Sequence, residues 1–275
     1  MDSEWWVLLG YSAFIFGASF LAGKLSSIGT LTHTRTQFLL SLISGFILGI
    51  AIFHMLPHAM ERISGPESEH VAVFWLVLGI AAMVVLMRVF NFHHHDFSDD
   101  AAQSHRQSEQ GVRRQSVVYI GVGLSLHTVS EGVALGSALE LSMSHSMHTL
   151  LPALGVFLAI VVHKPLDAYT LLTLMQSAKY TKLHRTLVNI GFAMICPIVA
   201  VAAYAATGLL GEMEGSHVAG LAMAFAAGAF ICIALSDLLP EIHFHTHDRF
   251  KLLVAFLAGL VLSYLIYFVE EGTVH

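Results

Sequence analysis

The sequence is poor in cysteine and in charged residues, and each shortage excludes a class of protein. Only two of the 275 residues are cysteines, Cys196 and Cys232, and both lie inside apolar runs. Their number and placement indicate neither a disulfide framework nor a thiolate metal site, so we interpret both as packing residues. Only 12% of the residues are charged and 56% are hydrophobic, whereas an ordinary soluble domain has about 25% charged residues. The composition predicts an integral membrane protein.

Several motifs of other protein classes are missing as well. Lys and Arg number 13 against 19 Asp and Glu, so there is no basic excess for nucleic-acid binding. There is no Gly-x-x-x-x-Gly-Lys loop for ATP, and no His-Glu-x-x-His pair of a zinc protease. The first apolar run follows Asp2 and Glu4 without a basic n-region, so we expect a retained first span and no cleaved signal peptide.

Long apolar runs dominate the chain. A helix needs about 20 apolar residues to cross the hydrocarbon core, and eight runs meet this need: about 5–23, 38–60, 71–90, 116–139, 149–178, 186–210, 217–241 and 250–270. We therefore expect an all-α integral membrane protein with eight transmembrane helices, forming one transmembrane domain over 1–275. The fifth run is long enough to tilt or to project beyond the bilayer.

Lys and Arg are distributed unevenly between these runs. If the N-terminus is outside, every basic residue lies on the inner side except Arg62, which is outside, and Lys164, which lies within the fifth span. Since basic residues collect on the cytoplasmic side of membranes, this pattern predicts that both termini are outside. The polar stretch at about 91–115, which contains His93-His94-His95, then becomes a His-rich cytoplasmic loop.

A weak internal repeat relates the second and seventh spans. Gly45 precedes His54-Met55-Leu56-Pro57-His58 by the same distance at which Gly228 precedes Asp237-Leu238-Leu239-Pro240-Glu241. In the predicted topology these two spans run in opposite directions, so the copies are inverted. We expect a 3+2+3 inverted-repeat arrangement, with a pseudo-two-fold axis between the fourth and fifth spans.

The two central spans each combine a histidine with a carboxylate four residues later: His127 with Glu131, and His163 with Asp167. This spacing places both groups on one helix face. One central ionisable residue costs about 2.5–3.5 kcal/mol in a membrane helix, so four together indicate an ion site. Two imidazoles and two carboxylates suit Zn2+ and tolerate Fe2+, Mn2+ or Cd2+. The spacing predicts a divalent metal site between the fourth and fifth spans.

Proline and glycine accompany these candidate ligands. Pro165 cannot donate to the carbonyl of Val161, and Gly132 weakens its own helix in a milder way. We expect the two bends to help shape an ion cavity. The alternative is that both residues are the proline and glycine common in membrane helices.

Two further pairs lie one helical turn apart at opposite ends of the predicted path. We expect His54 and His58, near the outer end of the second span, to gather the ion. We expect Asp237 and Glu241, near the inner end of the seventh span, to pass it to the cytoplasm. The alternatives are interfacial histidines satisfied by their neighbours, and acidic residues that solvate a helix end. His243, His245 and His247, like the 91–115 loop, are interpreted as solvated chelators or sensors.

The His-x-x-x-Glu-Gly of the fourth span, the His-x-x-x-Asp of the fifth, the His-rich loop and the eight-span layout resemble the ZIP (Zrt/Irt-like) family of metal-ion transporters. The His163-Lys164 pair is most similar to a subgroup whose fifth-helix motif opens with His-Lys. The resemblance implies import of zinc, and often of iron, manganese or cadmium, toward the cytoplasm. It implies a metal site between the fourth and fifth helices, with the metal as cargo and no prosthetic group.

Some positions depart from the family pattern. Many members have Asn where this chain has Thr128, and an acidic residue where it has Lys164, and these positions help to form a second metal site in binuclear members. The sixth span also lacks an acid, with Asn189 as its nearest polar candidate. The resemblance therefore implies one central metal. A Lys164 ammonium beside Glu131 or Asp167 would supply the charge of a second dication; the alternative is that it points away and snorkels.

Other functions remain open at this point. An intramembrane zinc-dependent hydrolase would also need His and carboxylate at the midplane, although it would not need a repeat. A metal exporter or a metal sensor could use the same scaffold. The expected partners are divalent metal ions and the lipid bilayer, with a homodimer as a further option, and the expected location is a cell (inner or plasma) membrane.

Overall fold

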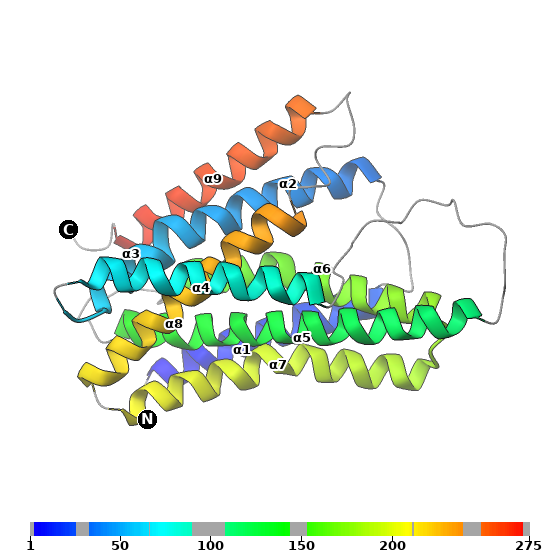
Figure 1. Ribbon diagram of the computed structural model, residues 1–275, viewed down its shortest axis with the longest axis horizontal. Coiled ribbons are helices and arrows are strands. Elements are labelled where there is room, and N and C mark those ends of the chain that lie inside the picture. The colour runs from blue at the N-terminus through cyan, green and yellow to red at the C-terminus, as the bar shows by residue number, and fades with distance from the viewer. Residues whose placement is uncertain are drawn as a thin grey trace.

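The computed structural model describes residues 3–25, 33–65, 67–89, 108–143, 153–210, 212–238 and 249–271. Within these ranges every regular element is a helix (Figure 1). In chain order they are α1 (Ser3–Leu25), α2 (His33–Ile50), the π-helix η1 (Ala51–Met55), α3 (Leu56–Arg62), α4 (Ser68–Val89), α5 (Ser108–Met143), α6 (Leu154–Ser177), α7 (Lys182–Leu209), α8 (Glu212–Ile233), the π-helix η2 (Ala234–Leu238) and α9 (Arg249–Glu271). The described part of the chain is all-α, as predicted.

Seven of the described helical stretches are long and apolar enough to cross a membrane: Trp5–Leu25, Gln37–Arg62, Ser68–Val89, Val117–Glu140, Leu154–Ser177, Lys182–Leu209 and Met213–Ser236. An eighth apolar stretch, Phe250–Ile266 in α9, is shorter. Each predicted span therefore coincides with an apolar helix, and the chain has the character of a multi-pass membrane protein.

One helix differs in length from the prediction. α5 begins at Ser108, inside the predicted 91–115 loop, and its 36 residues extend about 54 Å. The 24 residues of α6 extend about 36 Å, so both central helices exceed a hydrocarbon core of about 30 Å, and α5, the fourth span, is the longer of the two. Hydropathy missed this extension because its polar residues carry no apolar periodicity. The predicted loop residues before 108 lie outside the described ranges.

Glycines bring α2 and α9 together along their length (Figure 1). A Cβ on Gly45 of α2 would lie 1.9 Å from the carbonyl oxygen of Phe256 in α9. In the reverse direction, a Cβ on Gly259 of α9 would lie 2.1 Å from the carbonyl oxygen of Leu42 in α2. The absence of side chains at these two positions lets the backbones approach closely, as is common between membrane helices.

The pair α4 and α8 packs in the same way. A Cβ on Gly79 of α4 would lie 2.0 Å from the carbonyl oxygen of Phe225 in α8, and one on Gly228 of α8 would lie 2.0 Å from that of Leu76 in α4. Both helix pairs thus use one glycine on each helix to meet the backbone of the partner.

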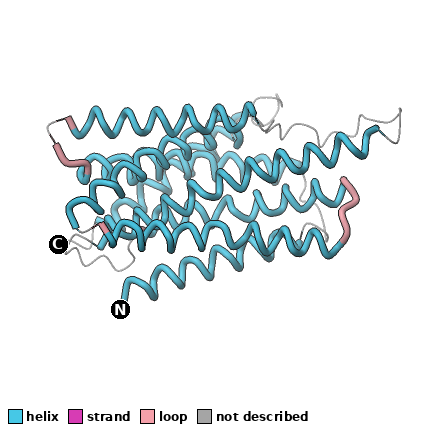
Figure 2. The backbone as a smooth tube through the Cα atoms, turned by 60° about the horizontal axis from the view of Figure 1, so that its bottom comes forward, coloured by secondary structure: helices cyan, strands magenta, loops and turns pink. Residues whose placement is uncertain are grey.

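The central helices α5 and α6 lie between two groups of helices. On one side, α5 packs against α7, and α1 packs against both α6 and α7; the rings of Tyr11 in α1 and Phe157 in α6 stack with centroids 4.0 Å apart. On the other side, α5 contacts α8 and α6 contacts α2. The described turns lie at the two ends of the bundle (Figure 2), so the middle of α5 and α6 is enclosed by other helices.

The two π-helices occupy equivalent positions in the sequence repeat. η1 begins six residues after Gly45, and η2 begins six residues after Gly228. In η1 the Leu56 N–H donates to the carbonyl of Ala51, and the following Pro57 has no N–H with which to continue an α-helical ladder. The sequence indicated uninterrupted spans here, so the widened turns are a finding of the structure.

The glycine contacts predict a stability effect. Gly79→Ala should lower the free energy of unfolding by about 1–3 kcal/mol, because its Cβ would collide with backbone that cannot move aside. The apparent melting temperature in detergent measures this. Gly191→Ala in α7 is the matched control, since a Cβ there meets nothing within 4 Å. Equal melting temperatures for the two variants would contradict this packing.

Candidate metal centre

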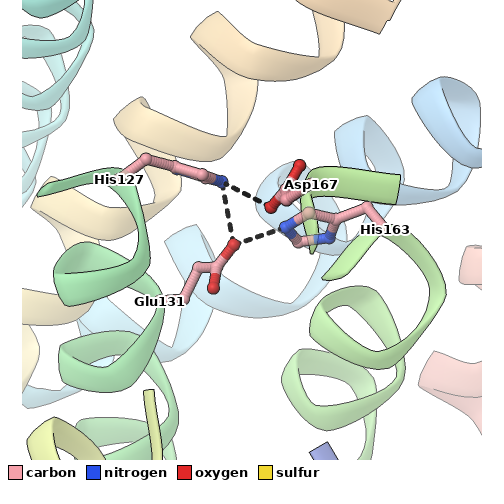
Figure 3. Close-up of side chains that lie close together, drawn as sticks. All are labelled: His127, Glu131, His163 and Asp167. Atoms are coloured by element: carbon pink, nitrogen blue, oxygen red, sulfur yellow. Dashed lines mark hydrogen bonds and ion pairs between the residues drawn. The ribbon is translucent and has the colours of Figure 1, made fainter. Parts of the chain in front are cut away.

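The two motifs of the central spans face one another across α5 and α6. α5 contributes His127 and Glu131, α6 contributes His163 and Asp167, and one ligand atom from each lies within 4.8 Å of all the others (Figure 3). The first three side chains are buried and Asp167 is nearly so. The four candidate central residues therefore come together from two helices, as their spacing predicts.

The carboxylate of Glu131 is the centre of the cluster. Its Oε1 lies 2.8 Å from Nε2 of His127 and 2.6 Å from Nε2 of His163. Asp167 is placed more loosely, with Oδ2 3.8 Å from Nε2 of His127. A single carboxylate oxygen is thus shared by two imidazoles from different helices.

The imidazole of His163 is oriented by the backbone of its own helix. Its Nδ1 lies 2.6 Å from the carbonyl oxygen of Ala159. Since a carbonyl oxygen only accepts, Nδ1 carries a proton and Nε2 faces the cluster, where its 2.6 Å contact with Oε1 of Glu131 uses a second ring proton that a bound metal ion would displace. Metal-binding histidines are usually fixed by such a bond from the second ring nitrogen.

Two members of the cluster have buried polar atoms without a hydrogen bond to the described residues. These atoms are Oδ2 of Asp167 and both ring nitrogens of His127, although Nε2 of His127 is close to Glu131. Buried polar atoms are rarely left in this way, because each unmade hydrogen bond costs free energy. The cluster therefore has capacity for a bound cation.

Lys164 is fully buried beside the cluster. Its Nζ lies 2.6 Å from Oε2 of Glu131, 2.5 Å from Oγ1 of Thr128 and 4.7 Å from the ring centroid of Phe192 in α7. The sequence allowed three positions for the Lys164 ammonium. In the structure it lies beside Glu131, and the side chain does not snorkel.

Pro165 and Gly132 lie inside the two helices that carry the cluster. Pro165 lies within α6, and the helix is continuous on both sides of it. Gly132 lies against α7, where a Cβ would be 2.7 Å from Cβ of Val199 and 2.9 Å from the carbonyl oxygen of Cys196. Gly132 therefore sets the distance between α5 and α7 beside Glu131.

The two outer histidines do not join the central group. His54 is 2% exposed, and its Nε2 lies 2.9 Å from the carbonyl oxygen of Ser263 in α9. His58 is partly exposed, with Nδ1 3.6 Å from a carboxylate oxygen of Glu61. In this structure His54 is therefore a buried histidine bonded to the backbone of α9, and its role as an entry ligand stays a prediction.

The remaining candidates either lie outside the described residues or lie away from the cluster. The backbone of Asp237 is part of η2, but its side chain is not described. The described residues also exclude Glu241 and the histidines of the two histidine-rich stretches. Asn189 joins α7 to α1, donating from Nδ2 to the carbonyl oxygen of Phe20 at 2.9 Å.

Two aromatic neighbours of the cluster were not identified from the sequence. Phe192 in α7 faces Lys164, and Phe230 in α8 packs edge-on to His163 with centroids 6.0 Å apart. Nothing in the sequence distinguished them, because phenylalanine is common in any apolar helix.

Comparison with known proteins agrees with these observations. A family model described as "ZIP Zinc transporter" matches residues 90–267. Zinc transporter ZIP9-B of Xenopus laevis is 28% identical over 179 residues, which are 63% of this chain and 54% of that protein. Zinc transporter ZIP9 of Micropogonias undulatus is 28% identical over 174 residues, or 61% of this chain and 50% of that protein.

The matched region spans about half the length of these relatives. The family model, in contrast, covers well over half of this chain and includes both α5 and α6. The chain belongs to the ZIP zinc transporter family.

Proposed function

We propose that the chain carries Zn2+, or a similar divalent ion such as Fe2+, Mn2+ or Cd2+, across a membrane toward the cytoplasm. The observation that carries the proposal is the buried group of two imidazoles and two carboxylates between membrane-spanning helices. The relatives' names as zinc transporters support the choice of metal. On this view His127, Glu131, His163 and Asp167 are the transport ligands.

The donor atoms need only small movements to hold an ion. Two ligands at about 2.1 Å on a tetrahedral zinc lie about 3.4 Å apart. Oε1 of Glu131 is nearer than this to both histidine nitrogens, at 2.8 and 2.6 Å, and Asp167 is slightly farther, at 3.8 Å from His127. Side-chain movements that shift atoms by less than about 1 Å would bring these three distances to the value for tetrahedral zinc. Such a site binds an ion without closing a rigid shell, as transport requires.

The same proposal includes an inverted repeat of three, two and three spans. The equal spacing of η1 and η2 from Gly45 and Gly228 supports it. The packing supports it too. In the proposed repeat α2 corresponds to α8 and α4 corresponds to α9, so the glycine-mediated pair α2–α9 corresponds to the glycine-mediated pair α8–α4. Likewise α1 corresponds to α7 and α5 corresponds to α6, so the α1–α6 contact corresponds to the α7–α5 contact.

We further propose an orientation and a path for the ion. Both termini lie outside, the loop at about 91–115 is cytoplasmic, and all of 1–275 forms one transmembrane domain in a cell membrane. His54 and His58 receive the ion from outside, and Asp237 and Glu241 release it inside. His54 keeps the contact of Nε2 with the carbonyl of Ser263 and binds the ion through Nδ1, the second ring nitrogen.

Loss of a central ligand should abolish uptake. In proteoliposomes loaded with a zinc-sensitive dye, His127→Ala and Glu131→Ala should reduce the initial rate to that of empty liposomes, because each removes a donor from the shared cluster. His184→Ala is the control, since His184 is exposed at the start of α7. Undiminished uptake by either central variant, in protein that elutes normally, would remove the assignment. Cleavage of lipid or peptide without uptake would favour a hydrolase.

The orientation has its own prediction. In a background with Cys196→Ala and Cys232→Ala, a membrane-impermeant maleimide should label Ser64→Cys in intact cells, because Ser64 is exposed beyond α3. Lys182→Cys, exposed at the other end of the bundle, should be labelled only after permeabilisation. The reverse labelling pattern would invert the topology.

The histidine-rich loop should be dispensable for basic transport. Deletion of residues 92–105 should leave the initial zinc uptake rate within about twofold of wild type, because the proposed ligands lie in α5 and α6 and solvated histidines bind metal only loosely. The same liposome assay measures this. A loss of uptake as complete as that of Glu131→Ala would make the loop part of the path.

A further inference from the structure

We propose that Lys164 and Thr128 position Glu131 so that only its Oε1 binds the transported ion, and that the fixed charge of Lys164 keeps this binding weak. The inference rests on the proposed function. It identifies two residues that set the affinity of the site without touching the cargo.

The ammonium group of Lys164 has three favourable neighbours. Nζ lies 2.6 Å from Oε2 of Glu131, 2.5 Å from Oγ1 of Thr128 and 4.7 Å from the ring centroid of Phe192. A lysine ammonium has three N–H donors and no acceptor, and an aromatic face is a favourable neighbour for a cation. The fully buried Lys164 is therefore held in one place.

Thr128 is oriented to accept from this lysine. Its Oγ1 lies 2.7 Å from the carbonyl oxygen of Leu124 one turn earlier. Because that carbonyl can only accept, the hydroxyl proton of Thr128 is directed to Leu124, and the oxygen lone pairs remain for Lys164. A hydroxyl is thus required at position 128, where valine would have the same shape without the acceptor.

These contacts give the two carboxylate oxygens of Glu131 different partners. Oε2 is taken by Lys164, and Oε1 faces His127 and His163. Binding of one ion by both oxygens would require the carboxylate to rotate away from Lys164. Glu131 therefore contributes one donor atom.

The charge of Lys164 changes the balance of the site. Because a histidine that binds a metal is neutral, the residues of the ion-bound site, Glu131, Asp167 and Lys164, sum to one negative charge, and without the lysine the sum would be two. Charges interact strongly in a low-dielectric interior, so a dication is held less tightly in the presence of Lys164. Weaker binding favours release, which limits the rate when an ion is bound too well.

Lys164→Met tests the inference, because methionine fills similar space without charge or donors. The Kd for Zn2+, measured by calorimetry with zinc chloride on purified protein, should fall at least tenfold, which corresponds to about 1.4 kcal/mol. In proteoliposomes the KM should fall with it, and the maximal rate should fall because release is slower. Lys179→Met, at an exposed lysine just beyond α6, should match wild type in all three quantities.

A second pair of variants decides the matter if Lys164→Met does not fold. Thr128→Val should lower the Kd in the same direction by about two- to fivefold, as expected for loss of one hydrogen bond, because a less firmly held Lys164 no longer restricts Glu131 to one oxygen. Thr128→Ser should restore the wild-type value. An unchanged or raised Kd in folded Lys164→Met, or equal affinities for Thr128→Val and Thr128→Ser, would overturn the inference. Wild-type protein that neither binds nor transports zinc would instead overturn the proposed function.

Discussion

The arrangement around the carboxylate of Glu131 is the constraint on which the rest of the site depends. Glu131 is fully buried in a helix that is apolar enough to span a membrane, where an uncompensated charge costs several kcal/mol. The structure compensates it on both oxygens, with His127 and His163 at one and Lys164 at the other. Removing any one partner leaves a buried charge without its full shell, so these residues act as a unit.

The fold provides the rigid surroundings that this unit needs. α5 and α6 lie between α1 and α7 on one side and α2 and α8 on the other. Gly132 allows α7 to approach α5 next to Glu131, and Phe230 of α8 packs against His163. Because dense packing permits few side-chain rotamers, the ligand distances are set by helix positions as much as by the ligands themselves.

The flanks of the site differ from its centre in backbone structure. The flanks include the π-helices η1 and η2, and π-turns are frequent at functional sites. His54 lies in η1, and its imidazole contacts the backbone of α9. The centre thus consists of regular helices with fixed side chains, while the flanks contain the turns in which backbone bonding has departed from the α pattern.

The sequence by itself determined the membrane character, the approximate spans and the four central residues, because hydropathy and a four-residue spacing are local properties of one helix. It left open whether Lys164 lies beside Glu131, lies beside Asp167 or points away and snorkels. Only the tertiary structure decided that Lys164 binds Glu131 and that Phe192 lies against the Lys164 ammonium. It also decided that His54 is buried against α9 and that α5 is longer than α6. The physical reason is that each of these outcomes depends on how far apart helices pack or on where polar helix residues continue an apolar span. Neither quantity is encoded in the periodicity of a single segment.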